Sequence, residues 1–214
     1  FEPVALVGSQ WFIVSVNAAL PVRTMQELVD YAKARPGQLN YASAGAGTPH
    51  HLGVELLKLR LGLDIVHVPF RGASAGLPDL LSGAIPIMFT SINNATAHFQ
   101  SGKLVALAVT SRERSPALPG VPTVAETVYP GYDVAAWFGV VAPARTPKEI
   151  VVTLNREIVA AMRQAEVTSR MTALGLDVLA STPQQMAATI AAEIATWKPV
   201  IEAAKLKDKE LELA

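Results

Sequence analysis

Short apolar runs alternate with longer helical patterns along most of the chain, and this alternation constrains the fold more than any other feature. Most of the runs are continuously apolar, which is typical of strands buried on both faces of a mainly parallel sheet. The alternation predicts an α/β fold. Seven runs are predicted strands: Val4–Val7, Phe12–Val16, Leu39–Ala42, Ile65–Val68, Ile85–Phe89, Val105–Val109 and Trp137–Val141.

The starts of the expected helices carry recognisable capping signals. Thr24–Glu27 and Thr123–Glu126 fit the capping box, in which the Thr hydroxyl and the Glu carboxylate satisfy free backbone N–H groups. Thr48, Thr146 and Thr182 each precede a proline, which is favoured at the first helical position. Helices are therefore expected to begin near residues 25, 49, 124, 147 and 183. Helix ends are predicted at Gly62, Gly83, Gly102 and Gly175.

Composition excludes several classes of function. The 214 residues suffice for one large domain or two small ones. Lys+Arg and Asp+Glu balance at 18 each, which argues against nucleic acid or an anionic membrane as the main partner. The absence of cysteine excludes disulfides, thiolate metal sites and a cysteine nucleophile. The four histidines lack the spacing of metal ligands, so neither a metal nor a cofactor is expected.

The segment from residue 40 to residue 51 is the first candidate site, because it predicts a strand, a glycine loop and a helix N-terminus in succession. Ligands of open α/β sheets bind beyond the carboxyl ends of the strands, where a helix N-terminus presents free N–H groups to an anion. Gly45 and Gly47 allow close approach of the backbone, and Ser43 and Thr48 add hydroxyl groups. The alternative is a simple turn whose glycines serve only its geometry.

The same loop lacks the signatures of nucleotide binding. The dinucleotide pattern G-x-G-x-x-G fails because its sixth position is His50, and no Gly-Lys-Ser/Thr follows as in a P-loop. No Lys or Arg lies in the loop, so a carboxylate fits it better than a polyphosphate. His51, close to the helix start, could also contact the ligand.

Gly72–Gly76 matches the pattern G-x-S-x-G of serine hydrolases and follows a predicted strand. A hydrolase needs an acid and a histidine further along the chain, but the only later histidine is His98, inside a helical pattern. A hydrolase that uses Ser74 is therefore the alternative function. The competing interpretation is a second ligand loop, in which Phe70 and Arg71 end the strand and Gly72 opens the turn.

A third polar loop follows the strand that ends at Phe89. Its Thr90 and Ser91 could complete a polar pocket with hydroxyl groups. Capping of the next helix explains the same residues equally well, since Ser91 or Asn93 would suffice for it. Both interpretations stay open.

These motifs, together with landmarks along nearly the whole chain, resemble the substrate-binding proteins of tripartite tricarboxylate transporters, the Bordetella uptake gene family. The resemblance rests on many ordered segments, namely Leu39–Thr48, His51-Leu52, Asp64–Gly72, Leu77–Gly83, Met88-Phe89, Gly102–Ser111, Arg114–Pro116, Val121–Glu126, Pro130–Tyr132, Trp137–Gly139 and Ala142–Pro147.

The resemblance implies a periplasmic solute receptor and not an enzyme. Its fold would be that of type II periplasmic binding proteins, two α/β lobes joined by a hinge that the chain crosses twice. Residues 1–17 and 134–214 would form lobe one, and residues 18–133 lobe two. The receptor would bind a small organic acid as a monomer and deliver it to the membrane permease subunits of the transporter.

The resemblance also implies which residues face the ligand. The expected ligand-binding residues are Ser43, Gly45, Ala46, Gly47, Thr48, His51, Phe70, Arg71, Gly72, Thr90 and Ser91.

The two ends of the chain depart from the family pattern. Phe1–Val4 is neither a basic signal-peptide start nor preceded by an initiator Met, so a processed product or a fragment is expected. The family carries a further strand, loop and helix before this point, so lobe one is expected to lack its N-terminal part. The charged run Lys205–Glu210 is typical of a solvated helix end.

Overall fold

The computed structural model describes residues 1–206, which fall into two compact units. Unit 1 consists of residues 1–10 and 136–198. Unit 2 consists of residues 11–135 and the segment from 199 onward. Most of the charged run that begins at Lys205 lies outside the described residues.

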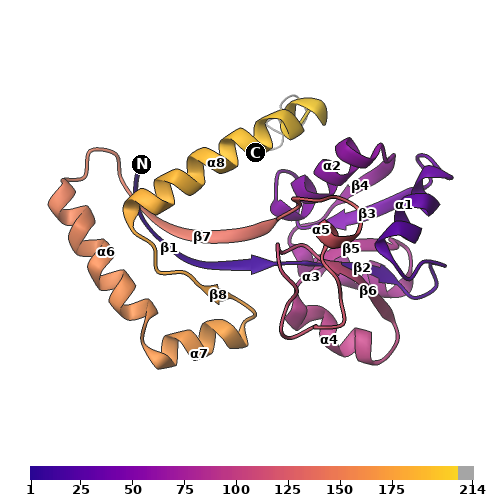
Figure 1. Cartoon of the computed structure of the whole chain (residues 1–214), viewed down its shortest axis with the longest axis horizontal. Helices are drawn as coiled ribbons and strands as arrows, with labels where there is room; N and C mark the ends of the chain where they lie inside the picture. The colour runs from indigo at the N-terminus through magenta and orange to yellow at the C-terminus, as the bar shows by residue number, and fades with distance from the viewer. Residues whose placement is uncertain (207–214) are drawn as a thin grey trace. The chain divides into compact units, whose positions relative to one another are not determined.

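Unit 2 is built around a five-stranded sheet whose strands lie in the order β4-β3-β5-β2-β6 (Figure 1). Strand β3 pairs in parallel with β4 and β5, whereas β2 runs antiparallel to its neighbours β5 and β6. The predicted parallel arrangement is therefore confirmed except at β2. The strands are β2 (Ile13–Asn17), β3 (Leu39–Ser43), β4 (Ile65–Pro69), β5 (Ile87–Thr90) and β6 (Leu104–Val109).

The place of β2 sets the boundary between the units. The strand lies between β5 and β6 in the five-stranded sheet, so its residues belong to unit 2. The boundary expected from the sequence placed residues 11–17, 134–135 and 199–214 with lobe one, and the division into units differs there. The physical reason at β2 is backbone pairing, because β2 pairs along its length with β5 and β6 of unit 2.

Helices cover both faces of this sheet, with α1 and α2 on one face and α3 and α4 on the other (Figure 1). Both predicted capping boxes form, with Thr24 and Thr123 as the capping residues. Gly62 and Gly83 end α2 and α3 in the left-handed conformation, as predicted. The helices are α1 (Met25–Lys33), α2 (Pro49–Leu61), α3 (Ala73–Ser82), α4 (Ile92–Gln100) and α5 (Val124–Thr127).

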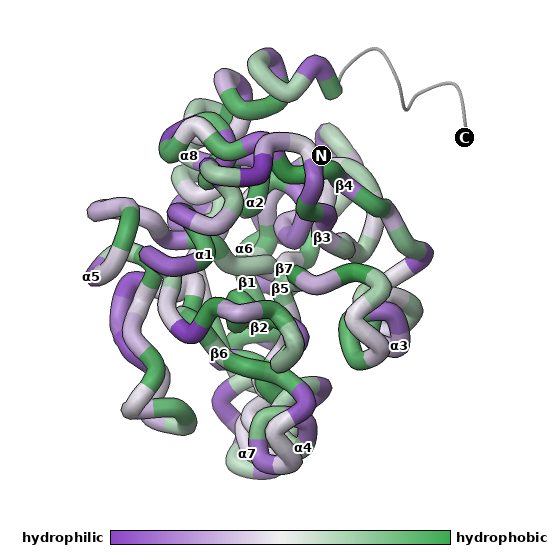
Figure 2. Tube along the Cα trace, turned by 90° about the vertical axis from the view of Figure 1, so that its right-hand side faces the viewer, coloured by the Kyte–Doolittle hydropathy of each residue, from purple (hydrophilic) through white to green (hydrophobic). Residues whose placement is uncertain are grey.

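The alternation of side chains along β3 divides the core of unit 2 into two layers. Tyr41 faces α2 and donates a hydrogen bond of 2.7 Å to Glu55 of that helix. Ala42 faces the opposite way, into a cluster with Leu80 of α3 and Met88 of β5. Figure 2 shows hydrophobic colour along the edge strand β6 as well. This double burial explains why the strands read as continuous apolar runs.

Unit 1 contains a three-stranded sheet in the order β7-β1-β8, and β1 and β8 pair antiparallel. The Asn155 side chain links α6 to β1 and to the segment before α8. Its amide donates hydrogen bonds of 2.8 Å to the carbonyls of Val4 and Ser181. The two-residue strand β8 was not predicted. The elements are β1 (Glu2–Trp11), β7 (Ala135–Ala142), α6 (Lys148–Met162), α7 (Ala165–Ala173), β8 (Asp177–Val178) and α8 (Pro183–Ala203).

Within the described residues, none of the helices combines the length and the apolar character that a membrane span requires.

Candidate functional site

Three neighbouring parallel strands of unit 2 end at one edge of the sheet, and a helix begins just after each of them. The order β4-β3-β5 places the ends of these strands side by side, and Ser43 is paired with Pro69 in the register. Helices α2, α3 and α4 begin at Pro49, Ala73 and Ile92. Their N-termini therefore carry free backbone N–H groups and positive dipole ends to the same edge.

The loop after β3 is folded on itself by hydrogen bonds among its own residues. The Thr48 hydroxyl donates to the Gly45 carbonyl at 2.6 Å, and the Gly45 N–H donates to the Ser43 hydroxyl oxygen at 3.1 Å. Gly45 has a φ of 128° and Gly47 a φ of 71°, values that disfavour any residue with a Cβ. The loop shape thus depends on the two glycines found in the sequence.

The loop after β4 is joined to the loop after β3 by backbone hydrogen bonds. The Phe70 N–H donates to the Ser43 carbonyl, and the Gly72 N–H donates to the Ala44 carbonyl, both at 3.1 Å. A Cβ on Gly45 would lie 3.4 Å from the Phe70 carbonyl oxygen. The first two candidate loops of the sequence are therefore one continuous structure.

Arg71 brings the only formal charge to the three loops at 43–48, 70–72 and 90–91. Its side chain is exposed, and it makes no hydrogen bond or ion pair with the residues that the structure describes. An anion at this edge would meet backbone N–H groups, hydroxyls and one guanidinium. That set suits a carboxylate better than a polyphosphate, as the sequence indicated.

The third loop has a buried part and an accessible part. Thr90 is 2% exposed, and its hydroxyl lies 2.6 Å from the Ser15 hydroxyl of β2. Ser91 is the N-cap residue of α4, but its side chain makes no capping hydrogen bond. The capping interpretation named Ser91 or Asn93, and capping by the Ser91 side chain is not observed, which leaves the Ser91 hydroxyl available to another group.

Two histidines lie stacked beneath the loop after β3. The ring centroids of His51 and His67 are 3.7 Å apart, and the rings are nearly parallel, with 9° between their planes. His67 Nε2 lies 2.6 Å from the Ser43 hydroxyl oxygen, and the Gly47 N–H donates to His51 Nδ1 at 3.0 Å. His51 is only 1% exposed, so its imidazole supports the loop from below.

His67 makes a contact with Ser43 that was not predicted from the sequence. Its register partner in the sheet is Tyr41, and its side chain shares a face of the sheet with Tyr41 and Ser43. Alternation along the strand predicts on which face of the sheet the His67 side chain lies. Only the pairing of β3 with β4, however, brings His67 close to Ser43. Burial, and after it the nearby His51, lowers the pKa of His67 from 6.5 to about 4.

Ser74 lies in the first turn of α3. In the described part of the chain its hydroxyl makes no hydrogen bond to a histidine, and His67 pairs with Ser43 instead. The described residues also contain no group of three or more His, Cys, Asp or Glu side chains that could hold a metal ion.

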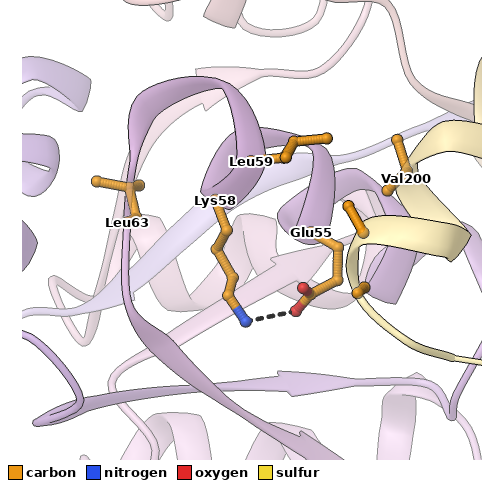
Figure 3. A pocket seen from close by; sticks show the side chains of 7 residues that line it. Glu55, Lys58, Leu59, Leu63 and Val200 are labelled. Carbon is orange, nitrogen blue, oxygen red and sulfur yellow. Dashed lines mark hydrogen bonds and ion pairs between the residues drawn. The ribbon is translucent and has the colours of Figure 1, made fainter.

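A separate pocket of about 190 Å³ in unit 2 lies between α2 and the last residues of α8. Figure 3 shows Glu55 and Lys58 at this pocket pointing toward one another, with 2.7 Å between the Lys58 Nζ and a Glu55 carboxylate oxygen. Because each charge already has its counter-ion, this pocket offers less to an anion than the loop edge does. The loop edge is therefore the candidate ligand site.

The fold and the loops at the strand ends place the chain among the periplasmic binding proteins. It matches over residues 1–206 the sequence model described as tripartite tricarboxylate transporter family receptor, and the chain belongs to this family. It is 36% identical over 207 residues to protein BugT of Bordetella pertussis, an alignment that covers 96% of this chain and 64% of BugT. The chain spans 60% to 64% of the length of such curated relatives.

Two solved structures from Rhodopseudomonas palustris are similar to the chain and contain organic acids. Rpa4515 with adipate is 35% identical with a TM-score of 0.84, and the match covers 96% of this chain and 69% of that one. MatC with bound malate is 33% identical with a TM-score of 0.79, and the match covers 94% of this chain and 69% of MatC. The predicted family and fold class are thus confirmed.

Proposed function

We propose that this chain is the ligand-binding part of a periplasmic receptor that captures a small organic acid and delivers it to a tripartite tricarboxylate-type permease. The observation that carries the proposal is the convergence of three helix N-termini and two glycine loops at one sheet edge. The adipate and malate bound to two relatives support a carboxylate as the ligand. The proposal takes units 1 and 2 as the two lobes of a monomeric receptor.

The expected ligand residues divide into two groups by exposure. Ser43, His51 and Thr90 are at most 2% exposed, and their side chains make hydrogen bonds inside unit 2. We assign these three the task of holding the loops. Direct contact with the carboxylate is assigned to the remaining residues, Gly45, Ala46, Gly47, Thr48, Phe70, Arg71, Gly72 and Ser91.

Thermal unfolding with a panel of acids tests the proposal. A ligand that binds only the folded chain stabilises it by about 2.7 kcal/mol at a hundred times its dissociation constant. Adipate and malate are expected to raise the unfolding temperature, and the neutral adipamide is not. A panel that includes adipate, malate, citrate and glutamate and gives no shift would contradict the proposal.

The guanidinium of Arg71 offers a sharper test of the site. Arg71→Gln is expected to weaken acid binding by roughly tenfold, the scale of one charge-assisted hydrogen bond. Arg163→Gln removes an equivalent positive charge from an exposed position in unit 1 and serves as the matched control. Equal affinities of the two variants would show that the acid does not bind at the loop edge.

The hydrolase alternative is tested by a fluorophosphonate probe. Ser74 has no histidine partner in the described residues, so we expect no labelling above that of the Ser74→Ala variant. Labelling that disappears in Ser74→Ala would favour the hydrolase.

A further inference from the structure

The Gly47 N–H bond to His51 fixes the protonation of that imidazole. Nδ1 accepts this hydrogen bond at 3.0 Å, so Nδ1 must present its lone pair and the ring proton must sit on Nε2. That proton faces the Glu55 carboxylate, whose Oε1 is 3.9 Å from Nε2. A second proton on Nδ1 would turn the acceptor into a donor and leave the Gly47 N–H without its partner.

His67 holds the other end of the same loop. Its Nε2 lies 2.6 Å from the Ser43 hydroxyl, which also accepts the Gly45 N–H at 3.1 Å. While Nε2 is unprotonated, the Ser43 hydroxyl proton points to it. Once Nε2 carries a proton it becomes the donor, and the hydroxyl proton must turn to its other acceptor, the Gly45 carbonyl at 3.2 Å.

The stacked arrangement disfavours charge on either ring. With 3.7 Å between ring centres, a proton on one imidazole repels a proton on the other. Tyr41 of β3 and Glu55 and Lys58 of α2 are titratable or charged groups that lie around the pair. Lys58 and Tyr41 both donate hydrogen bonds to Glu55 Oε1. The Glu55 carboxylate is therefore shared among several partners and does not interact with the histidines alone.

We propose that His51 and His67 are positioning residues that keep the loop from Ser43 to Thr48 in its ligand-receiving shape only while both are neutral, so that acidification weakens ligand binding. This inference rests on the function proposed above and adds its regulation by protons. Because the ligand would bind the neutral form, affinity is highest near neutral pH and falls as pH approaches the pKa of His67, about 4.

Two substitutions at His51 distinguish the contribution of its hydrogen-bond acceptor from that of its titrating imidazole ring. In His51→Asn, the side-chain carbonyl oxygen can take the place of Nδ1, and it does not titrate. In His51→Leu the acceptor is lost and a similar apolar volume is kept. Dissociation constants for adipate and malate are to be measured by calorimetry from about pH 7.5 to about pH 3.5, a range that includes the ordinary histidine pKa of about 6.5 and the pKa of His67, about 4.

The expected results differ for the two variants. His51→Asn retains the affinity of the unmodified chain near neutral pH to within about threefold, and its affinity falls less on acidification. His51→Leu binds about tenfold more weakly even near neutral pH, because the Gly47 N–H has lost its acceptor. Titration of the ligand carboxylates is common to all three proteins and cancels when their affinities are compared at each pH.

Two results would overturn the inference while leaving the proposed function intact. One is equal affinity of His51→Leu and the unmodified chain. The other is a His51→Asn variant whose affinity falls with pH as steeply as that of the unmodified chain. A merely structural role for His51 would weaken both variants alike and would leave the pH profile unchanged.

Failure of the proposed function is recognised separately, since the unmodified chain would then bind no acid at any pH. Hydrogen exchange of the Gly47 amide still tests the positioning role without ligand. Protection is expected in the unmodified chain and in His51→Asn, and its loss is expected in His51→Leu. Equal protection in all three proteins would refute the role of His51.

Discussion

The hydroxyl oxygens of Ser15 and Thr90 lie 2.6 Å apart in the interior of unit 2, where they join β2 to β5. Both residues are buried, at 0% and 2% exposure. Thr90 was expected to face the ligand because it ends a strand at the loop edge. Its hydroxyl pairs with that of Ser15, and we assign to Thr90 the task of fixing the antiparallel strand β2 against β5.

Thr90→Val should therefore lower stability by about 1–3 kcal/mol, because it leaves the buried Ser15 hydroxyl without its partner. Thr90→Ser keeps the hydroxyl and should lose less. Urea unfolding of the two variants, of Ser15→Ala and of the Ser15→Ala/Thr90→Val pair gives the coupling between the two side chains. Additive effects of the two single changes would contradict a hydrogen bond between them.

Gly53 in α2 lies against the sheet so closely that a Cβ there would be 2.8 Å from the Phe89 ring and 3.0 Å from the Tyr132 hydroxyl. Tyr132 is buried and donates a hydrogen bond of 3.0 Å to the Gly53 carbonyl. Gly53→Ala is expected to destabilise unit 2 by about 1–3 kcal/mol, despite the better helix propensity of alanine.

Gly120→Ala is the matched control, because nothing lies within 4 Å of the added Cβ at that position. Its unfolding midpoint should stay close to that of the unmodified chain. If both variants unfold at the same denaturant concentration, the close approach of α2 to the sheet is not as tight as described.

Thr24 and Ser91 are both N-cap residues, but only Thr24 makes a capping hydrogen bond, which it accepts from the Glu27 N–H at 3.1 Å. Thr24→Ala should cost about 1 kcal/mol of unfolding free energy, and Ser91→Ala should cost little. If the proposed site is correct, Ser91→Ala weakens acid binding and Thr24→Ala does not. The reverse pattern in either measurement would contradict the assignment.

His50 packs against Phe12 with 4.2 Å between the rings, and its buried Nδ1 has no hydrogen-bond partner in the described residues. Burial lowers the pKa of His50 from 6.5 to about 4. Between these two values the unfolded chain binds a proton that the folded chain does not. Stability contributed by the neutral imidazole is therefore complete above the upper value and is lost as pH falls toward the lower one.

His50→Leu should raise the urea midpoint, and the gain should be larger near pH 5 than near pH 7, because both the unpaired nitrogen and the titration are removed. His50→Asn removes the titration but keeps a polar group. Its stability should lie below that of His50→Leu while its pH dependence is equally shallow. A steep pH dependence in both variants would assign the acid sensitivity to other groups.

Much of the local structure could be predicted from the sequence, because its signals act over a few residues. The capping boxes at Thr24 and Thr123 depend on groups three positions apart, and the glycine at position 62 needs only its own backbone freedom. For the same reason the loop from Ser43 to Thr48 was placed correctly between a strand and a helix.

The two-residue strand β8 could not be predicted, since Asp177 and Val178 form a strand only by pairing with β1. The division into units at β2 likewise depends on which strands its backbone bonds reach. Neither feature has a signature within its own segment.

The sequence by itself determined the α/β class, the order of the elements other than β8 and the glycine loop at the end of β3, because periodicity, capping and backbone freedom are encoded locally. Tertiary structure alone decided what supports that loop. His67 reaches Ser43 only because β4 pairs in register with β3, and His51 reaches His67 only because α2 packs over that face of the sheet. Such contacts depend on packing between segments far apart in the chain, which no local pattern records.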